Sequence, residues 1–355
     1  MSADLHVLVP GSLSRRTGGT IYDARMTAAL RNQGWRVTVH ELDGTFPAVD
    51  SPAAAALGAT LEALPDGAVT VIDGLALGDS PQLAEAQRGR LCLIALVHHP
   101  LADENGLDTA TQRRFLEREA RALAACEGVI VTSAFTARRV AELGVPPERV
   151  RVAEPGTDAA EPATGPGADA PPELLCVASL TPRKGQDVLV AALTRLVDLP
   201  WRATLAGTTD PDPTFARRVQ QQVAAAGLAA RIRFTGACDG ATLANLYHHA
   251  TMFVLPSHYE GYGMVLTEAL ARGLPVISTT GGAIPDTVPA AAARLVPPGD
   301  ADALAKALEY WLHHPDARAR AAAAASAHRT TLPGWPQAAT RFAAAITELE
   351  IQDTR

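Results

Sequence analysis

The stretch MFVLPSHYEGYGMVLTEALARGLPVIST, residues 252–279, contains a strand, a turn, a helix and a second strand in direct succession. MFVLP (252–256) is a short apolar run, the turn HYEGYG follows, and MVLTEALARG has helical spacing up to Gly273. PVIST (275–279) begins the next apolar run. Two apolar strands joined by a helix are typical of a parallel sheet covered on both faces by helices. The stretch therefore predicts an α/β fold.

The same alternation extends over the rest of the chain. Apolar runs bounded by turn or cap residues occur in the first half at 5–11, 35–42, 68–74, 90–99 and 128–133. A second series occurs at 174–179, 201–207, 231–236, 252–256, 275–279 and 294–299. The sequence therefore predicts two Rossmann-like halves, each a doubly wound parallel sheet.

The two series are separated by EPGTDAAEPATGPGADAPPE (154–173), which is rich in Pro, Gly and Ala and has little periodicity. Such a composition is typical of a linker. We therefore predict an N-terminal domain over 1–155, a linker over 156–172 and a C-terminal domain over 173–333. The segment after Pro333 has the pattern of an amphipathic helix, which could pack on either half; a return to the N-terminal domain would place 334–355 there.

The composition narrows the class of protein. In 355 residues, 47% are hydrophobic and 19% charged, which is typical of a soluble globular chain. The net charge of −7 gives no sign of nucleic-acid binding, and a polybasic membrane-binding surface is not expected. No apolar run approaches the roughly 20 residues of a membrane-spanning helix. The four cysteines show no metal-binding spacing, and the N-terminus does not resemble a signal peptide, so we expect a reduced, cytoplasmic protein.

In open parallel sheets, ligands bind at the carboxyl ends of strands, close to helix N-termini. After the first strand, Gly18 and Gly19 precede a helix, where glycine lets backbone amides approach a ligand closely, although a simple turn explains them equally well. Their spacing is not G-x-G-x-x-G, which argues against an NAD-dependent oxidoreductase. His98 and His99 end another apolar strand; such a histidine either donates into a site or is satisfied by a loop carbonyl.

Two charged motifs follow strands of the second half. Arg183 and Lys184 precede a helix, which suits a diphosphate, although basic residues on a loop are often simply solvated. Glu260 lies before the helix of the opening stretch and Glu268 about two turns within it. The amides of 261–265 lie at the helix start, where they can donate to a phosphate, while the carboxylates can accept from vicinal hydroxyls.

EGYGMVLTEALARGLPV, together with TPRKG and the early TGG, resembles the retaining glycosyltransferases of family 4, which have the GT-B fold. VRVAEPGTD, GLPVISTTGG and GGAIPDTV extend the resemblance over nearly the whole chain. It implies a nucleotide-diphosphate sugar bound by the C-terminal half, an acceptor bound mainly by the N-terminal half, and chemistry in the cleft between them.

The resemblance also implies roles for particular residues. Glu260, His98 and Lys184 are the expected catalytic residues: Glu260 and His98 near the sugar, with His99 as the reserve candidate, and Lys184 on the diphosphate. Glu268 is expected to accept from the ribose hydroxyls. The implied donor-binding residues are Gly19, Ser179, Arg183, Lys184, Gly236, Ala237, Glu260, Gly261, Tyr262, Gly263, Met264, Val265 and Glu268. Ser179 departs from the family, because many members have arginine there, and Asp286 replaces a more usual glutamate.

The expected reaction is front-face transfer with retention, which requires no cofactor and no metal. Two Asp-x-Asp strings exist, at 210–212 and 300–302, but Asp300 has the sequence context of an ordinary helix cap. We expect a UDP-sugar as the favoured donor and a soluble small-molecule acceptor, with Arg15, Arg16, Tyr22, His99 and Asp103 as candidate acceptor contacts. A GT-B epimerase or hydrolase acting on sugar nucleotides and a non-catalytic sugar-nucleotide binding protein remain alternatives.

Overall fold

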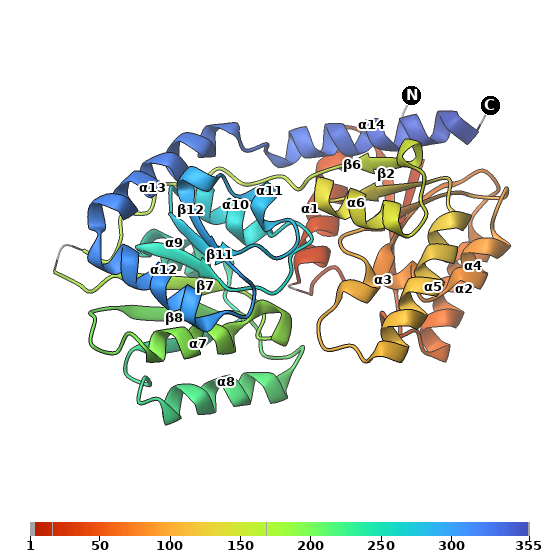
Figure 1. Ribbon diagram of the computed structural model, residues 1–355. Coiled ribbons are helices and arrows are strands. Elements are labelled where there is room, and N and C mark those ends of the chain that lie inside the picture. The colour runs from red at the N-terminus through yellow and green to blue at the C-terminus, as the bar shows by residue number, and fades with distance from the viewer. Residues whose placement is uncertain (1–3, 16, 168, 354–355) are drawn as a thin grey trace. The chain divides into compact units, whose positions relative to one another are not determined.

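The computed structural model describes residues 4–15, 17–167 and 169–353, and Arg16 lies outside them. The chain forms two compact units (Figure 1). The N-terminal unit comprises Met1–Gly156 together with Pro333–Arg355, and the C-terminal unit comprises Thr157–Leu332. Each unit is built on a six-stranded sheet, so the predicted α/β class with two doubly wound parallel sheets is confirmed.

The sheet of the N-terminal unit has the strand order β2-β1-β3-β4-β5-β6, and all its neighbouring pairs are parallel. The strands are β1 Asp4–Pro10, β2 Arg36–Leu42, β3 Val69–Asp73, β4 Cys92–Val97, β5 Gly128–Val131 and β6 Val150–Val152. The order reverses direction after β1, so β1 and β3 border the topological switch point, where open sheets commonly bind ligands.

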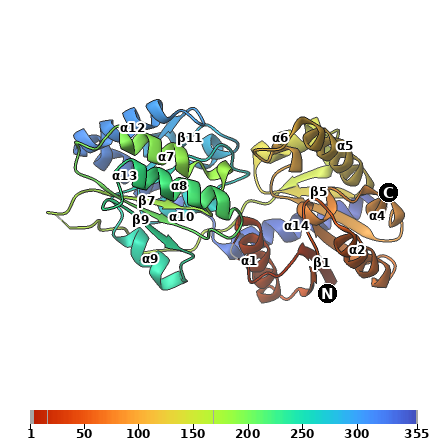
Figure 2. The same cartoon turned by 90° about the horizontal axis from the view of Figure 1, so that it is seen from below.

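Helices cover both faces of this sheet (Figure 2). The α-helices are α1 Gly18–Asn32, α2 Ser51–Ala63, α3 Gly74–Leu77, α4 Pro81–Ala86, α5 Thr109–Ala125, α6 Ala134–Glu142 and α14 Trp335–Asp353. Two 3₁₀ turns are η1 Leu101–Asp103 and η2 Pro147–Arg149. Because helices lie on both faces, every residue of β4 (CLIALV) is buried, which explains why this strand is apolar throughout its length.

The last helix, α14, packs against α1 of the N-terminal unit. Its first residue, Trp335, makes edge-on ring contacts with Tyr22, which also contacts Phe342. The chain reaches this position by passing Gly156, where a Cβ atom would lie 2.4 Å from the Trp335 nitrogen. Only glycine therefore allows the two backbone segments to approach so closely.

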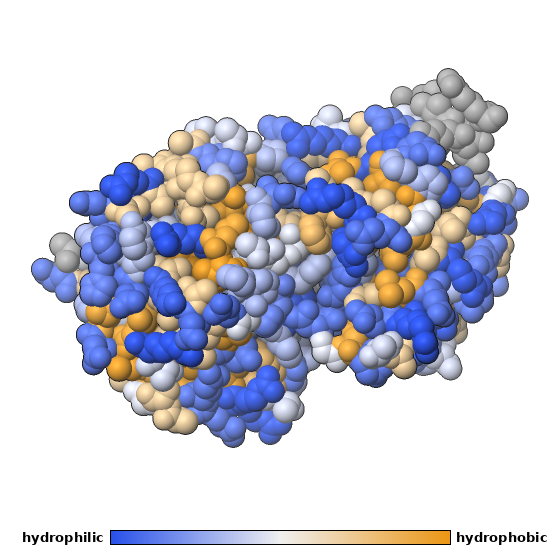
Figure 3. All heavy atoms as spheres, viewed as in Figure 1, coloured by the Kyte–Doolittle hydropathy of each residue, from blue (hydrophilic) through white to orange (hydrophobic). Residues whose placement is uncertain are grey.

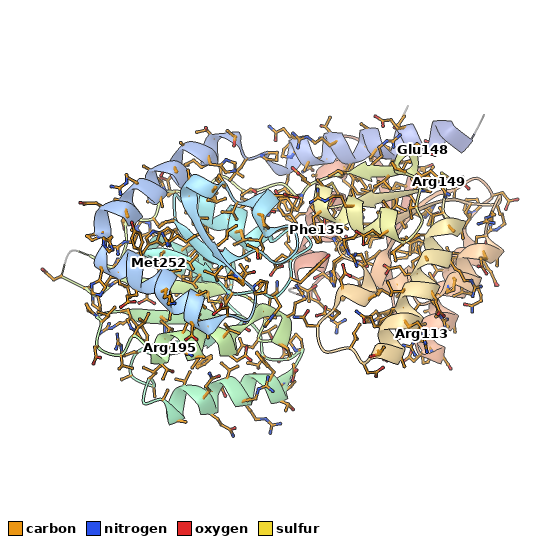
Figure 4. The ribbon with its side chains drawn as sticks, in the orientation of Figure 1. Arg113, Phe135, Glu148, Arg149, Arg195 and Met252 are labelled. Carbon is orange, nitrogen blue, oxygen red and sulfur yellow. The ribbon has the colours of Figure 1, made fainter. Side chains whose placement is uncertain are left out.

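The sheet of the C-terminal unit has the strand order β12-β11-β10-β7-β8-β9, again with all neighbouring pairs parallel. The strands are β7 Glu173–Val177, β8 Arg202–Ala206, β9 Ile232–Gly236, β10 Met252–Leu255, β11 Val276–Thr279 and β12 Ala293–Val296. Here the switch point lies between β7 and β10. Met252, labelled in Figure 4, is fully buried at the start of β10.

The helices of this unit follow its strands in the predicted alternation. They are α7 Gln186–Thr194, α8 Pro213–Ala225, α9 Gly240–His248, α10 Met264–Ala271, α11 Ile284–Thr287, α12 Ala301–His313 and α13 Pro315–His328. The 3₁₀ turns are η3 Pro182–Lys184, η4 Ala290–Ala292 and η5 Arg329–Thr331.

The predicted linker is partly bound to the C-terminal unit. The amide of Ala163 donates to the Arg272 carbonyl, and the amide of Thr164 donates to the His248 carbonyl. The C-terminal unit therefore includes residues from Thr157 onward, earlier than the sequence-based start at 173. Composition predicts the lack of regular structure in this segment but gives no signal for its hydrogen bonds to the ends of α9 and α10.

The hydrophobic residues on the face seen in Figure 3 lie in small groups among hydrophilic ones. In the part of the chain that the structure describes, the exposed large hydrophobic side chains are scattered along the sequence: Ile21, Leu116, Val152, Val197 and Tyr310. Within the described residues, none of the helices combines the length and apolar character that crossing a membrane requires.

Candidate functional site

The turn between β10 and α10 buries the carboxylate of Glu260. Its Oε1 accepts hydrogen bonds from the Lys184 ammonium at 2.6 Å and from the Ser257 hydroxyl at 2.6 Å. The Arg183 guanidinium lies 3.6 Å from the other oxygen, Oε2. Two predicted donor-binding cations and a predicted sugar-binding carboxylate are therefore brought together in one cluster.

Lys184 reaches this position because the turns after β7 and β10 are bonded to each other. The amide of His258 donates to the Arg183 carbonyl at 2.7 Å, and the Arg183 side chain donates to the Tyr259 carbonyl at 3.0 Å. Gly185 has φ +67°, and a Cβ there would lie 2.2 Å from the Pro256 carbonyl oxygen. The glycine of TPRKG thus allows the lysine turn to lie directly against the end of β10.

The charges of the cluster decide the protonation of Glu260. Burial raises the pKa of this carboxyl, but the opposing attraction of Lys184 and Arg183 and the hydrogen bonds from Lys184 and Ser257 lower it below its usual value. The carboxylate is therefore ionised at neutral pH, and it holds the lysine ammonium at the switch point between β7 and β10.

The late motif GGAIPDT fixes the backbone of the same turn. The amide of Ala283 donates to the Glu260 carbonyl at 2.8 Å, and the Thr287 hydroxyl donates to the Tyr262 carbonyl at 2.8 Å. A Cβ on Gly282 would lie 2.2 Å from the Glu260 carbonyl oxygen. The carbonyls of this turn are thus bound by α11 and the residues before it, which sets the direction in which Gly261, Gly263 and Met264 lead into α10.

Glu268 is held by a tyrosine that the sequence analysis did not identify. The Tyr247 hydroxyl donates to Glu268 Oε2 at 3.0 Å and also lies 3.4 Å from the Val265 carbonyl. Arg272 lies over the Tyr247 ring at 4.3 Å and donates to the Glu268 carbonyl. Burial, together with the Glu268 charge, raises the pKa of Tyr247 far above its usual value, so its hydroxyl remains a donor.

The remaining predicted donor contacts lie at the same edge of this sheet. Gly236 ends β9 with φ +69°, and Ala237 is exposed directly after it. Ser179 follows β7, and its carbonyl accepts from the Gln186 side chain at 3.0 Å. Because β7, β8 and β9 are neighbouring parallel strands, their carboxyl ends lie along one edge of the sheet.

In the N-terminal unit, Gly19 lies against His98, since a Cβ on this glycine would lie 3.3 Å from His98 Cδ2. Two acids that were not identified from the sequence also lie close to this ring. His98 Nε2 lies 3.3 Å from Asp23 Oδ1 and 3.5 Å from Asp73 Oδ2. Asp73 ends β3, His98 follows the neighbouring strand β4, and Asp23 lies in α1, which follows β1, so all three come from elements beside the switch point.

These three groups shift one another's protonation. Burial alone would lower the pKa of His98, but the Asp23 and Asp73 carboxylates raise it to about 10. Burial raises the pKa of Asp23 to about 7 against the opposing effect of His98, with Asp73 adding to the rise. Their ligand atoms all lie within 4.8 Å of one another, a spacing compatible with shared protons or with a metal ion.

The residues predicted to contact the acceptor differ from one another in burial and in their partners. Tyr22, a candidate acceptor contact, has a buried side chain whose hydroxyl donates to the Ala153 carbonyl at 2.9 Å. Asp103 accepts two hydrogen bonds from the Arg139 guanidinium, and His99 lies 3.4 Å from Glu104. Arg15 is exposed on the loop before α1. Apolar neighbours far along the chain bury Tyr22, which local sequence does not reveal.

The Asp-x-Asp strings contribute helix caps. Asp212 accepts from the Phe215 amide at the start of α8, and Asp300 accepts from the Ala303 amide at the start of α12. The prediction that Asp300 is an ordinary cap is confirmed.

Two family profiles match this chain. Glycosyl transferases group 1 matches residues 161–328, and Glycosyltransferase Family 4 matches residues 78–161. Glycogen synthase of Mycobacterium tuberculosis is 31% identical over 283 residues, which cover 74% of this chain and 64% of the relative. The chain spans between 32% and 64% of the length of the first curated relatives it matches.

Solved structures share the fold over the whole chain. Sucrose-phosphate synthase from Thermosynechococcus elongatus superposes with a TM-score of 0.82 at 22% identity, covering 99% of this chain and 100% of that one. Anabaena HepE, solved in complex with UDP and glucose, gives a TM-score of 0.75 at 19% identity, covering 97% and 99%. The resemblance found in the sequence is confirmed: the chain belongs to glycosyltransferase family 4 and has the GT-B fold.

Proposed function

We propose that this chain is a retaining glycosyltransferase that moves a sugar from a nucleotide-diphosphate sugar to a soluble small-molecule acceptor without a required metal. The observation that carries the proposal is the cluster of Lys184, Arg183 and Glu260 at the switch point of the C-terminal unit. Positive charge at such a point suits a leaving diphosphate, and a fixed carboxylate suits sugar hydroxyls.

In the proposed reaction, the bond between sugar C1 and the phosphate oxygen breaks, and its electron pair leaves with the diphosphate. The acceptor hydroxyl oxygen forms the new bond to C1 on the same face, and its proton passes to the departing phosphate oxygen. Lys184 and Arg183 stabilise the charge that develops on that oxygen. Glu260 orients the sugar, and no covalent bond to the protein forms.

The ribose of the donor is assigned to Glu268. Its carboxylate is held by the buried Tyr247 hydroxyl, so its position is set before any ligand binds. A pre-oriented acceptor group loses little side-chain freedom when a vicinal diol binds. UDP is the favoured nucleotide because HepE, which shares the fold, was solved with UDP and glucose. A small soluble acceptor is favoured by the net charge of −7 and the 5% aromatic content, which suit a lipid surface poorly.

Thermal unfolding against UDP-, GDP-, ADP- and dTDP-sugars, in buffer containing EDTA, tests the proposal. A ligand at about 100 times its Kd stabilises a protein by about 2.7 kcal/mol, and we expect this from one nucleotide series. Glu268→Ala and Lys184→Ala should abolish the shift. Lys306→Ala, which removes an exposed lysine of α12, is the matched control and should retain it.

Turnover distinguishes the proposed transferase from its alternatives. A sugar-nucleotide hydrolase or epimerase consumes or isomerises the donor at its full rate with no acceptor present. A binding protein shows the thermal shift but no turnover with any acceptor. We expect donor consumption to rise with an acceptor and the product to keep the anomeric configuration of the donor, as measured by proton NMR.

A further inference from the structure

We infer that Asp23 and Asp73 are positioning residues, which together fix the ring of His98 and keep it as an imidazolium ion. The role of that ion in sugar transfer rests on the proposed function. The charge and orientation of the ring rest on the contacts within the N-terminal unit alone.

The three side chains come from three elements beside the switch point between β1 and β3. Asp23 lies in the second turn of α1, Asp73 is the last residue of β3, and His98 follows the last residue of β4. Both acids approach the same ring nitrogen, at 3.3 and 3.5 Å from Nε2. Two carboxylates on one nitrogen favour a proton on that nitrogen, because an unprotonated Nε2 would direct its lone pair at both of them.

The two carboxylates are buried, which strengthens their need for a protonated His98. The Asp23 and Asp73 side chains are 0% and 2% exposed. Among the described residues, neither oxygen of the Asp23 carboxylate has a hydrogen bond, and neither does His98 Nε2, whereas Asp73 accepts from the Leu75 amide at 2.7 Å. A buried carboxylate without a compensating charge is costly, so the imidazolium is the group that stabilises the pair.

Tyr22, the described residue whose ring packs against His98, adds no charge. The Tyr22 ring packs edge-on against His98 at 5.1 Å, and its hydroxyl is bound to the Ala153 carbonyl. Burial raises the pKa of Tyr22 far above its usual value, so this phenol is neutral. Among the residues that the structure describes, the titratable groups recorded against His98 are Tyr22 and Asp23 from α1 and Asp73 from β3.

The contacts also set the orientation of the ring. The acids lie at its Nε2, and the Tyr22 ring packs against it in a T-shaped arrangement. A Cβ added to Gly19 would lie 3.3 Å from its Cδ2, so the ring fits closely beside this glycine. An imidazolium keeps a second N–H donor at Nδ1. The His98 side chain is 16% exposed, so this second N–H donor is largely shielded from water, where a hydrogen bond to a nearby oxygen anion is stronger.

The direct test is ¹⁵N NMR of the histidine rings in the full chain without any ligand. The chain has ten histidines, and His98→Gln assigns the His98 signals by difference. We expect both His98 nitrogens to stay protonated at pH 8.5, where exposed histidines are neutral. In Asp73→Asn and in Asp23→Asn/Asp73→Asn, His98 should lose its proton at least one pH unit lower. Asp66→Asn, which removes an 87% exposed acid of the same unit, should leave the signal unchanged.

Transfer rates give the second readout. Asp73→Asn should lower kcat more than tenfold at pH 8 and less than threefold at pH 6, because the lower pH restores the proton on His98. A merely structural role would reduce the rate equally at both values. Chemical shifts outside the cluster should match those of the wild type, which shows that the variant has folded.

Two results would overturn the inference. The first is a neutral His98 in the wild-type protein at pH 7. The second is a stoichiometric metal found by elemental analysis of the purified protein and lost in Asp73→Asn, which would make the cluster a metal site. The NMR result stands whether or not any sugar nucleotide binds, so failure of the proposed function and failure of this inference are distinguishable.

Discussion

Lys184 and Glu260 are 76 residues apart in the chain, yet the lysine Nζ lies 2.6 Å from the glutamate Oε1. The distance follows from the strand order, because β7 and β10 are neighbours in the sheet although two strands lie between them in sequence. The turns after these strands each carry one charge of the pair. In the described structure, the residues assigned to the diphosphate and to the sugar hold each other in place.

Glu260→Gln should destabilise the C-terminal unit by about 3–5 kcal/mol, because it leaves the buried Lys184 ammonium without its counter-charge. The Lys184 and Glu260 side chains are only 16% and 7% exposed, so water replaces the carboxylate poorly. Urea unfolding measures the loss. In Lys184→Met/Glu260→Gln, the total loss should be smaller than the sum of the two single losses.

The matched control is the exposed pair of Arg195, labelled in Figure 4, and Asp302, which lie 2.6 Å apart. Arg195→Gln should cost less than about 1 kcal/mol, because water solvates both of these charges. Equal losses for Glu260→Gln and Arg195→Gln would contradict the burial argument.

Gly185→Ala should destabilise the chain more than Gly227→Ala. Both glycines have left-handed backbones, with φ +67° and φ +70°, so alanine carries a similar conformational cost of about 1–2 kcal/mol at each. At Gly185, the new Cβ would also lie 2.2 Å from the Pro256 carbonyl oxygen, whereas at Gly227 nothing lies within 4 Å. Chemical denaturation measures the free energy of unfolding of both variants, and the difference between their losses is the cost of the clash at Gly185. Equal losses would show that the turn moves aside without cost.

The sequence predicts the elements and the strand ends well, because burial on both sheet faces makes each strand a continuous apolar run. It also places Lys184 and Glu260 after strands of the same sheet. However, it predicts that each binds a ligand and does not predict that they bind each other. Their ion pair depends on strand order, which no local pattern encodes. Asp73 offered a signal, since it ends a buried strand in VTVID.

Asp23 and Tyr247 have weaker signals in the sequence than Asp73. Asp23 lies in a helical pattern, where an acid usually indicates a solvated face, and only the packing of α1 against the sheet makes it buried. Tyr247 lies in α9, and its contact with Glu268 exists because its ring stacks on Phe253 of β10, with centroids 5.8 Å apart. Contacts of this kind follow from tertiary packing of segments that are separate in the sequence.

Tyr247→Phe should cost about 0.5–1.5 kcal/mol of stability, because it removes the buried hydroxyl that donates to Glu268. The ring keeps its contacts with Phe253 and Arg272, so the core is retained. Under the proposed function, donor affinity should fall about fivefold to tenfold, or about 1–1.4 kcal/mol. Calorimetric titration checks this, and Tyr310→Phe, at a partly exposed ring, is the control. An unchanged donor affinity in Tyr247→Phe would show that the hydrogen bond from Tyr247 to Glu268 does not contribute to donor binding.

The Asp23–His98 pair should make the stability of the N-terminal unit fall as pH rises. The pKa of Asp23 is about 7 in the folded chain against an ordinary value of 3.8, so the folded state holds the extra proton between these values. The pKa of His98 is about 10 against 6.5, so its contribution to stability is complete below pH 6.5 and is lost as pH rises through 10.

Asp23→Asn removes the pH dependence that comes from Asp23, and it reduces the part that comes from His98 because one of the two carboxylates beside the ring is lost. In urea unfolding from pH 5 to 9, the free energy of wild type minus that of Asp23→Asn should therefore decrease steadily with pH. Asp66→Asn should give a difference that does not change with pH, and a rising difference for Asp23→Asn would reverse the sign of the proposed linkage.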